Sequence, residues 1–429
     1  MRNRTLWRSL TLAAAFVPLF GVLPLANRER MMQPPSSPDA ATLAEGRRIF
    51  RYDTFGDEAW WGGTLRLHEA IATVSPRTAL SVGLKVDVDA LPPNLQNQLR
   101  HGRVDLDDPL TTLTLLKLNA VIGVTGRFGA DGRLQTMGIQ CAFCHSTVDD
   151  SLTTGVGHRL DGWANRDLDV GLIVSLAPNL QPIADLLQTD VATVKTVLTS
   201  WGPGRFDAIL DKDGKAFRPD GGQAGTLIPP AFGLAGVNLH TWTGFGSVPY
   251  WNAYVAVTEM HGSGTFFDAR LSDPEQYPVA ARTGSWNTRG TPDLVTSKLP
   301  ALHAYQISLR APKPPAGSFN PAAAARGKAV FTGKAQCATC HVPPLFTEPG
   351  NNLHAPDEIG VDAFQADRSP THMYRTSPLA GLWTHQKGGF YHDGRFATVE
   401  DVIDHYDSFF DLGLTSGERA DLEEYLLSL

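Results

Sequence analysis

The chain has 429 residues, long enough for two or three domains, and its hydrophobic fraction of 42% and charged fraction of 19% are ordinary for a globular protein. The formal net charge is −7 and basic residues form no run, so the sequence argues against a protein that binds nucleic acid. The chain contains 41 glycines and 30 prolines, which predicts much loop between its secondary-structure elements.

Residues 1–26 have the pattern of an export signal. Three arginines stand among the first eight residues, and residues 9–26 carry no charge. Pro24 departs from the small residue expected before a cleavage point at Ala26, and the uncharged stretch approaches the length of a short membrane span. We predict a cleaved signal peptide, with a retained membrane anchor as the alternative. Either one places the body of the chain in the periplasm or facing it, with membrane contact only if the leader is retained.

Residues 27–41, rich in proline and serine, are predicted to be a flexible lead-in. A helix is then expected to begin near Ala41. Its core at residues 44–50 follows the pattern Ala-x-Gly-basic-x-branched-Phe, and residues 325–331 repeat that pattern far downstream. Because each copy precedes one of the two cysteine motifs described below, we interpret the repeat as the opening helix of two related domains.

The two copies differ in how far they stand from their cysteine motifs. Phe331 lies six residues before the second motif, whereas Phe50 lies ninety-one residues before the first, so the first domain is predicted to carry a long insertion. Within it, residues 84–88 alternate like a strand, and residues 121–139 have the pattern of a hairpin that turns at Asp131-Gly132. That hairpin would deliver the chain to the first motif.

All four cysteines stand in two pentapeptides, Cys141-Ala-Phe-Cys144-His145 and Cys337-Ala-Thr-Cys340-His341. Cys-x-x-Cys-His is the attachment sequence of c-type haem, in which two thiols on one helical turn add to the haem vinyl groups and the histidine binds the iron. A thiol redox pair would not require the histidine, and zinc-binding pairs usually lie closer together in sequence. The motifs therefore predict two covalently bound c-type haems with His145 and His341 as iron ligands. Thiol redox chemistry is the alternative, and haem attachment makes the haem-assembly machinery a partner.

Beyond the first motif, a helix is expected at about residues 190–200, and Gly202-Pro203-Gly204 directly after it would end it. The stretch 201–268 is dense in aromatic residues, which either pack on a porphyrin or form a core under long loops.

For the face of the first haem opposite its histidine, the sequence offers four candidate ligands, which are His158, His240, Met260 and His261. If that position is open, the iron can bind peroxide or dioxygen; if it is filled, the iron suits electron transfer. In the tripeptide Glu259-Met260-His261, the glutamate would place an acid or base beside a possible ligand. The end of a surface helix explains the same three residues equally well.

Prolines at residues 311–320 mark a linker between an N-terminal haem domain at residues 42–310 and a C-terminal cytochrome c domain at residues 321–429. Asn320 is expected to cap the first helix of the C-terminal domain, and Thr415 with Glu418 forms a capping box for its last helix. Packing of the last helix against the first is the usual plan of a cytochrome c domain. We predict a mainly α fold with two cytochrome c-type domains, the first enlarged by loop and short β-hairpin insertions.

Within the C-terminal domain, Tyr374-Arg-Thr-Ser-Pro378 is followed by Gly388-Gly-Phe-Tyr-His392-Asp393-Gly394 and then by Asp404-His405-Tyr406. Here the chain resembles the bacterial dihaem cytochrome c peroxidases and their relatives, which include the dihaem enzyme that matures methylamine dehydrogenase and the dihaem rubber oxygenases. The resemblance implies that the oxidant reacts at the N-terminal haem. The family's catalytic acid, its tryptophan between the haems and its calcium between the domains have no matching motif, so no residue is assigned to them.

In that family the helix after the His-Asp-Gly segment supplies the sixth ligand of the second haem. Thr398 is predicted to cap this helix, with Asp401 three residues on. The peroxidases have methionine at about the position of Tyr406, so this chain departs from them, and the resemblance implies a His/Tyr or His/His centre with either Tyr406 or His405 on the iron. Neighbouring helical residues point about 100° apart, so only one of the two can bind. His392 is expected to fix its loop instead.

These features predict an exported dihaem c-type cytochrome. The leading hypothesis is a peroxidase-like or oxygen-activating redox enzyme that passes electrons between two covalent haems, from the second to the first. The alternative is a non-enzymatic dihaem electron carrier, since most small c-type domains only carry electrons. The expected redox partner is a small donor protein or a quinol pathway.

Overall fold

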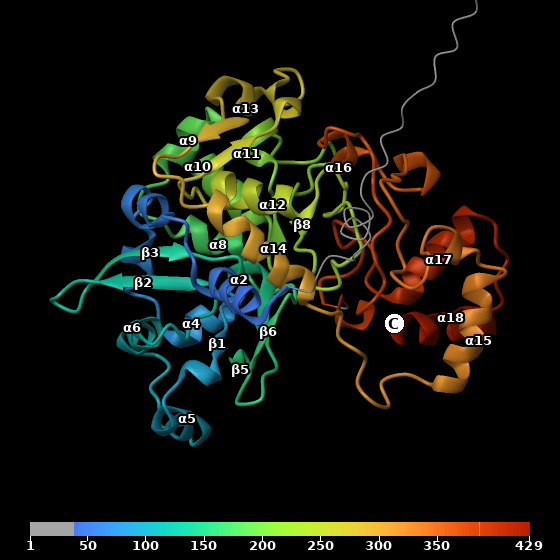
Figure 1. Cartoon of the computed structure of the whole chain (residues 1–429), viewed down its shortest axis with the longest axis horizontal. Helices are drawn as coiled ribbons and strands as arrows, with labels where there is room; N and C mark the ends of the chain where they lie inside the picture. The colour runs from blue at the N-terminus through green and yellow to red at the C-terminus, as the bar shows by residue number, and fades with distance from the viewer. Residues whose placement is uncertain (1–37, 386) are drawn as a thin grey trace, which may run out of the picture. The chain divides into compact units, whose positions relative to one another are not determined.

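The structure is a computed structural model that describes residues 38–385 and 387–429 (Figure 1). The predicted signal peptide or anchor at residues 1–26 and most of the lead-in at residues 27–41 lie outside the described residues. Ala40–Leu429 form one compact unit that is mainly helical, as predicted. Among its described helices, none combines the length and the apolar character that a membrane crossing requires.

Short helices separated by loops make up most of the chain. The α-helices are α2 (Ala40–Tyr52), α3 (Leu67–Ile71), α4 (Pro76–Ser81), α5 (Pro93–Arg100), α6 (Pro109–Lys117), α7 (Ala142–His145), α8 (Val170–Ser175), α9 (Gln181–Leu187), α10 (Val191–Ser200), α11 (Leu210–Asp213), α12 (Val248–Tyr254), α13 (Pro278–Thr283), α14 (Leu299–Ser308), α15 (Pro321–Thr332), α16 (Phe364–Asp367), α17 (Val399–Phe409) and α18 (Ser416–Leu427).

The strands of the described residues pair only two by two. The antiparallel pairs are β2 (Val124–Phe128) with β3 (Leu134–Ile139), β4 (Ser146–Val148) with β6 (Arg159–Asp161), β7 (Arg205–Phe206) with β8 (Thr226–Leu227), and β9 (Thr265–Phe267) with β10 (Asn287–Arg289). β1 (Val86–Asp87) pairs in parallel with β5 (Val156–Gly157). Because each of these sheets has two strands, helices and loops supply the core.

The sequence repeat marks the same helix crossing in both halves of the chain. In the first copy α2 packs against α14, and a side chain at Gly46 would overlap the carbonyl oxygen of Ala301. In the second copy α15 packs against α18, which Figure 1 draws side by side, and a side chain at Gly327 would overlap the carbonyl oxygen of Asp421. Each glycine therefore lets two helix backbones approach closely.

The phenylalanine of each repeat packs in the same way. Phe50 and Phe331 are both fully buried. Phe50 meets Tyr305 of α14 edge to face with ring centroids 5.6 Å apart, and Phe331 meets Tyr425 of α18 at 5.2 Å. Each tyrosine stands four residues after the position that faces the glycine, so the opening and closing helices of both halves share one packing arrangement.

Replacement of Gly327 by alanine should lower the free energy of unfolding by about 3 kcal/mol, the upper part of the range for overpacked sites, because the two helices must separate. Gly417→Ala in α18 is the matched control, since no atom lies within 4 Å of its added carbon. It should leave stability unchanged or raise it by roughly 0.5 kcal/mol through helix propensity. Urea unfolding of the two variants checks this, and an equal effect of both would contradict the helix-crossing argument.

Local patterns predicted some of the elements that lead to the cysteine motifs, but not the short helices α3 to α6. The hairpin at residues 121–139 is confirmed as β2 and β3, with Gly132 in the left-handed region at φ 77°. The strand expected at residues 84–88 is shorter, because the Asp87 carboxylate accepts the amide of Asp89 and turns the chain into a 3-10 helix. The helix at about residues 190–200 is confirmed as α10.

The helix caps of the C-terminal part are also confirmed. The Asn320 side chain accepts the amides of Ala322 and Ala323 at the start of α15. Thr398 with Asp401 forms a capping box on α17, and Thr415 with Glu418 forms one on α18. Residues 309–320 contain neither helix nor strand, in agreement with the linker composition.

Candidate haem sites

A cavity of about 530 Å³ lies beside the second cysteine motif. Cys337, Cys340 and His341 line it together with mostly apolar side chains from α15, α17 and α18. This volume falls in the usual range for cofactor and ligand sites. Two thiols and one imidazole that border a large apolar cavity fit the donor set and the shape that a c-type haem requires.

The His341 ring is held in the state that binds a metal. Its Nδ1 donates a hydrogen bond to the Phe346 carbonyl oxygen at 2.9 Å, so Nε2 is the unprotonated nitrogen. Burial lowers the pKa of His341, which keeps the ring neutral. The hydrogen bond also fixes the ring orientation.

The structure places Tyr406 and His405 differently. Tyr406 of α17 lines the cavity beside Val402 and Ile403. His405 does not line it; its Nε2 lies 3.1 Å from the Ile359 carbonyl oxygen, and its ring stacks on Phe409 with centroids 5.9 Å apart. The choice that the sequence left open therefore depends on how α17 is rotated about its axis, and this rotation favours Tyr406.

The hydroxyl of Tyr406 sits in an apolar environment. Burial raises the pKa of Tyr406, and the hydroxyl of Tyr391 opposes that shift. The rings of Tyr391 and Tyr406 lie 6.2 Å apart. Met373, the methionine of this domain, has an exposed side chain and lies outside the lining of the cavity.

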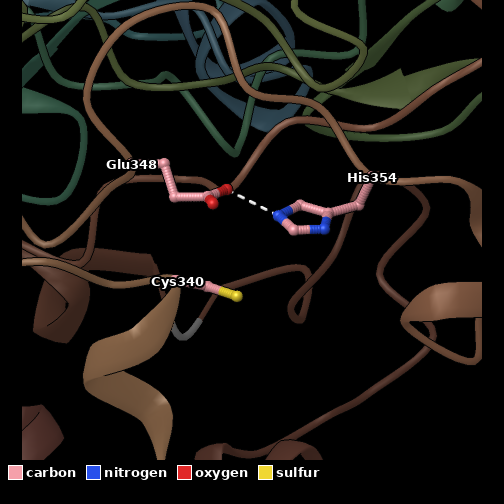
Figure 2. Close-up of side chains that lie close together, drawn as sticks. All are labelled: Cys340, Glu348 and His354. Atoms are coloured by element: carbon pink, nitrogen blue, oxygen red, sulfur yellow. Dashed lines mark hydrogen bonds and ion pairs between the residues drawn. The ribbon is translucent and has the colours of Figure 1, made fainter.

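Figure 2 shows a small polar cluster next to Cys340. The Glu348 carboxylate accepts hydrogen bonds from His354 Nε2 at 2.5 Å and from the Thr376 hydroxyl at 2.7 Å. Cys340, Glu348 and His354 bring one ligand atom each within 4.8 Å of one another, as a metal site would. If Cys340 carries haem, its sulfur is committed to a thioether bond, so this cluster serves to hold the loop after the motif.

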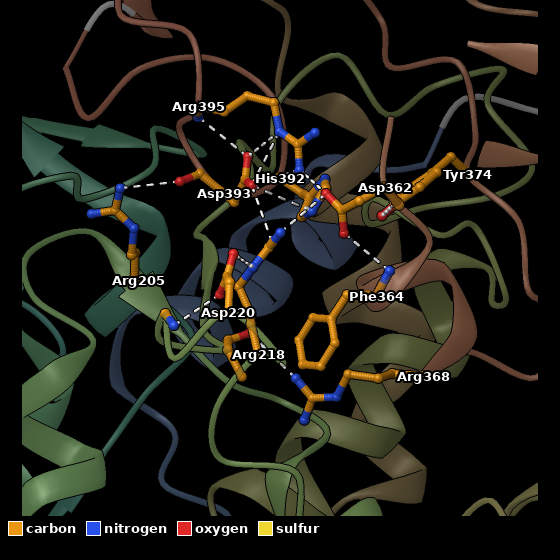
Figure 3. A network of polar contacts seen from close by, with 12 residues as sticks. Arg205, Arg218, Asp220, Asp362, Phe364, Arg368, Tyr374, His392, Asp393 and Arg395 are labelled. Atoms are coloured by element: carbon orange, nitrogen blue, oxygen red, sulfur yellow. Dashed lines mark hydrogen bonds and ion pairs between the residues drawn. The ribbon is translucent and has the colours of Figure 1, made fainter. Parts of the chain in front are cut away.

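A charged network surrounds His392, as Figure 3 shows. His392 is buried and stacks on Tyr374 with ring centroids 5.1 Å apart. Asp393 pairs with Arg395 at 2.7 Å and with Arg218 at 3.3 Å, and both arginines also pair with Asp362. The carbonyl oxygen of His392 accepts the amide of Leu227, in agreement with a role in fixing its loop.

Asp362, His392 and Asp393 also bring ligand atoms within 4.8 Å of one another. Two arginines already neutralise the two carboxylates, so this group does not need a cation. The calcium implied by the family resemblance therefore remains without assigned residues.

The first motif follows directly on the hairpin. Cys141 comes two residues after β3, and α7 carries the rest of the motif to His145. Cys141 packs against one apolar cluster of the N-terminal half and Cys144 against another. Burial lowers the pKa of His145 to about 4, and the carbonyl of Pro229 opposes that shift. A neutral, half-buried imidazole next to two cysteines that pack on apolar clusters fits an iron ligand.

The cysteines do not fit the thiol redox alternative. Burial raises the pKa of Cys141 and of Cys144 to about 12 each, and that of Cys337 to about 11. Reactive thiols need the opposite shift, because the thiolate is the nucleophile. Half-buried thiols with raised pKa values are instead suited to a permanent bond.

The four candidate ligands of the first haem occupy different environments. His158 is exposed and its Nδ1 lies 3.0 Å from the Asp89 carboxylate. His240 is buried with its Nε2 3.1 Å from the Val237 carbonyl oxygen. Met260 is buried in the same apolar cluster as Cys141, and the ring of His261 stacks on Trp60 at 3.9 Å.

The reading of Glu259–His261 as a surface helix end is wrong. Residues 255–259 form a π-helical turn, and the Glu259 side chain is only 8% exposed. Burial raises the pKa of Glu259 well above its usual range, and the carboxylate lies 3.8 Å from the ammonium of Lys212. Trp60 belongs to a second π-helical turn, at residues 59–64, and such turns are frequent at functional sites.

Sequence reasoning missed the contribution of the N-terminal half to the second cavity. Arg166, Pro229, Phe232 and Trp242 line it together with the residues around Cys337. In the aromatic stretch at residues 201–268, several rings pack in the core, whereas Trp242 borders the cavity. The density of aromatic residues was the sole signal in the sequence.

No family model matches the chain. Over 89 residues it is 39% identical to the methylamine utilization protein MauG of Methylorubrum extorquens. This match confirms the resemblance to the MauG and dihaem cytochrome c peroxidase superfamily. The match covers 19% of this chain and 24% of MauG, so the chain spans about a quarter of the length of that relative.

Two solved structures are distantly similar. A MauG-like protein associated with microbial copper homeostasis is 18% identical with a TM-score of 0.33, over 50% of this chain and 76% of that one. The hydrazine synthase of Kuenenia stuttgartiensis is 18% identical with a TM-score of 0.27, over 48% and 73% of the two chains.

Proposed function

We propose that this chain is a dihaem c-type cytochrome with a peroxidase-like redox function, built from two cytochrome c domains. The observation that carries the proposal is the cavity that brings Cys337, Cys340, His341 and Tyr406 together. The helix crossing that occurs in both halves supports two related domains, one for each motif. A c-type haem would supply an iron that exchanges single electrons.

At the second site, His341 and Tyr406 are the two protein groups that we propose as iron ligands. His341 offers Nε2, because its Nδ1 is committed to the Phe346 carbonyl. Tyr406 offers its hydroxyl from α17. Two protein ligands leave no position for an oxidant, so this site is suited to electron transfer.

At the first site, the buried Glu259 is the group that we propose as a proton donor. Its neighbour Met260 packs in the same apolar cluster as Cys141. Burial raises the pKa of Glu259, which favours its protonated form, and the Thr258 hydroxyl donates to the carboxyl oxygen at 3.0 Å. Reduction of peroxide consumes protons as well as electrons, so a protonated carboxyl near the reacting centre is useful.

Reaction with peroxide tests the proposed function. The reduced protein, mixed with peroxide in a stopped-flow spectrometer, should be reoxidised faster than free haem at the same concentration. If it is not, the chain is a non-enzymatic dihaem carrier, and carbon monoxide should then leave the spectrum of the reduced protein unchanged. A carbon monoxide shift with peroxide reactivity would support an open iron position.

Tyr406→Phe should convert one low-spin ferric haem into a high-spin one, because the phenyl ring cannot bind iron. His405→Phe is the matched control on the same helix, and its ferric spectrum should be unchanged. Low-temperature electron paramagnetic resonance of the oxidised proteins counts the high-spin centres. A change in the His405 variant with none in the Tyr406 variant would reverse the assignment.

We further propose that the protein is exported to the periplasm, where haem-assembly machinery attaches both groups. The charge pattern of residues 1–26 supports export. A small donor protein or a quinol pathway would supply electrons. Contact with a membrane is expected only if the leader is retained.

A further inference from the structure

Arg375 is a half-buried cation that makes no ion pair among the described residues. Its Nε and Nη1 donate to the carbonyl oxygens of Thr241 and Leu239, each at 2.7 Å. Among the ion pairs of the described residues, none involves Arg375, and burial alone lowers its pKa to about 10. The side chain lines the cavity of the second motif.

Arg166 is a second such cation on the same cavity. It is 7% exposed, and its Nε and Nη1 have no hydrogen-bond partner among the described residues. Burial and the neighbouring Arg205 lower the pKa of Arg166 to about 10. The neighbouring charge of Arg205 has the same sign, which makes this environment more unfavourable for a guanidinium.

Two other arginines with buried side chains, Arg368 and Arg159, are paired. Arg368 contacts two carboxylates, those of Asp207 and Asp213, and Arg159 contacts the carboxylate of Asp87 at 3.0 Å. Burial of a charge is unfavourable unless a counter-ion compensates it. Two unpaired guanidinium groups that line one apolar cavity therefore indicate that the occupant of the cavity brings its own negative charges.

We propose that Arg166 and Arg375 bind the two propionate carboxylates of the haem attached to Cys337 and Cys340. This inference rests on the proposed function, because it requires haem in this cavity. The propionates are the two negative groups at the edge of a haem, so their number matches the two arginines. Arginine is suited to this role because its planar group forms strong, charge-assisted hydrogen bonds with carboxylates.

Both arginines would then be positioning residues that connect the halves of the molecule. Arg166 directly follows Asn165, whose amide donates to the carbonyl oxygen of Cys144 at 2.9 Å. A residue hydrogen-bonded to the first motif is therefore the direct chain neighbour of Arg166, which we propose as a ligand of the second haem's propionate. Arg375 is held by carbonyls of residues 239–241, which also belong to the N-terminal half.

The variants Arg166→Gln and Arg375→Gln in the full-length holoprotein test the proposal. In each variant, one propionate loses the cation that compensates its charge. The uncompensated negative charge then stabilises the oxidised iron. At the wild-type midpoint potential, the ratio of reduced to oxidised second haem should fall about tenfold, the effect of one lost charge-assisted hydrogen bond. The potential should also begin to fall with rising pH, because an unpaired propionate titrates in the accessible range. Spectroelectrochemistry between pH 5 and pH 8 measures both effects.

The variants Arg166→Lys and Arg375→Lys keep the charge and should restore most of the potential. Arg326→Gln, an exposed arginine paired with Asp421, is the control and should leave both potentials unchanged. If a Gln variant loses the second haem, rescue by the Lys variant supports the proposal, and equal loss in both overturns it.

Two further outcomes separate this inference from the proposed function. A wild-type chain without covalent haem would refute the proposed function itself. Two attached haems with unchanged, pH-independent potentials in both Gln variants would refute the propionate assignment alone. Acetate added to the wild-type holoprotein should leave its spectrum unchanged, because the arginines are already occupied. A saturable spectral shift that disappears in the Gln variants would instead assign them to a free anion.

Discussion

A chain in which Cys337 and Cys340 are both replaced by alanine should be one haem mass lighter than the wild type after export. In the proposed dihaem protein, two thioether bonds of the second motif would be the covalent links that survive denaturation, so their loss would leave at most a dissociable haem. Replacement of Cys141 and Cys144 should have the same effect on the first haem. Intact mass under denaturing conditions, together with the alkaline pyridine spectrum, counts the haems per chain.

The fourfold variant is the internal control for this count. All four cysteines of the sequence belong to the two motifs, so a chain without them should carry no covalent haem. A wild-type mass that equals the bare polypeptide would remove the basis of every functional statement above. An equal haem content in the wild type and the Cys337/Cys340 variant would show that attachment does not use the second motif.

Arg368→Met should lower the free energy of unfolding by about 3–5 kcal/mol, because it leaves buried carboxylates without their cation. Arg368 is fully buried, with its Nε 2.6 Å from Asp213 and its Nη2 3.0 Å from Asp207. The Tyr277 hydroxyl also donates to the Arg368 carbonyl oxygen at 3.1 Å. This ion pair joins α11 and the loop before it to the residue after α16, so its loss should also loosen the contact between distant segments.

The stability lost in Arg368→Met should depend on pH. Burial raises the pKa of Asp207 to about 6 and also raises that of Asp213, even with the arginine present. A carboxyl whose pKa is raised in the folded state favours folding at low pH and loses that contribution as pH rises through its folded pKa. Without the cation this effect grows, so the deficit relative to wild type should be larger at pH 7 than at pH 5.

Urea unfolding at both pH values measures this difference. The triple variant Arg368→Met, Asp207→Asn, Asp213→Asn should recover much of the lost stability at pH 7, because it removes the buried charges together with their partner. Arg77→Met, which breaks an exposed pair with Asp107, is the matched surface control and should have no measurable effect. A deficit that is equal at both pH values would contradict the charge argument.

Features that depend on a few neighbouring residues could be predicted from the sequence. The caps at Asn320, Thr398 and Thr415 are examples, because a side chain there bonds an amide two or three residues on. The strand at residues 84–88 was predicted too long, because its length depends on a partner strand that lies far away in the sequence. Alternation alone does not reveal that its partner β5 has two residues and that Asp87 turns the chain.

The sequence shows the two cysteine motifs of the candidate site, but it does not show which distant residues surround them. The spacing within residues 337–341 indicates haem chemistry by itself, since the two thiols and the imidazole act within one helical turn. Nothing in the sequence relates Arg166 to that segment. The two are about 170 positions apart in the chain and line the same cavity only because the chain is folded. Nor does the sequence show that Arg375 lacks an acidic partner, which is a property of everything packed around it.

By itself, the sequence determined where the two motifs lie, which helix opens each half, and which helix closes the C-terminal half. The tertiary structure alone decided that Tyr406 and not His405 borders the cavity, that Glu259 is buried, and that two unpaired arginines line the second site. The physical reason is how far apart in the sequence the interacting residues stand. Caps and motifs depend on contacts within a helical turn, whereas helix rotation, desolvation and unmatched charge depend on neighbours brought in from the rest of the fold.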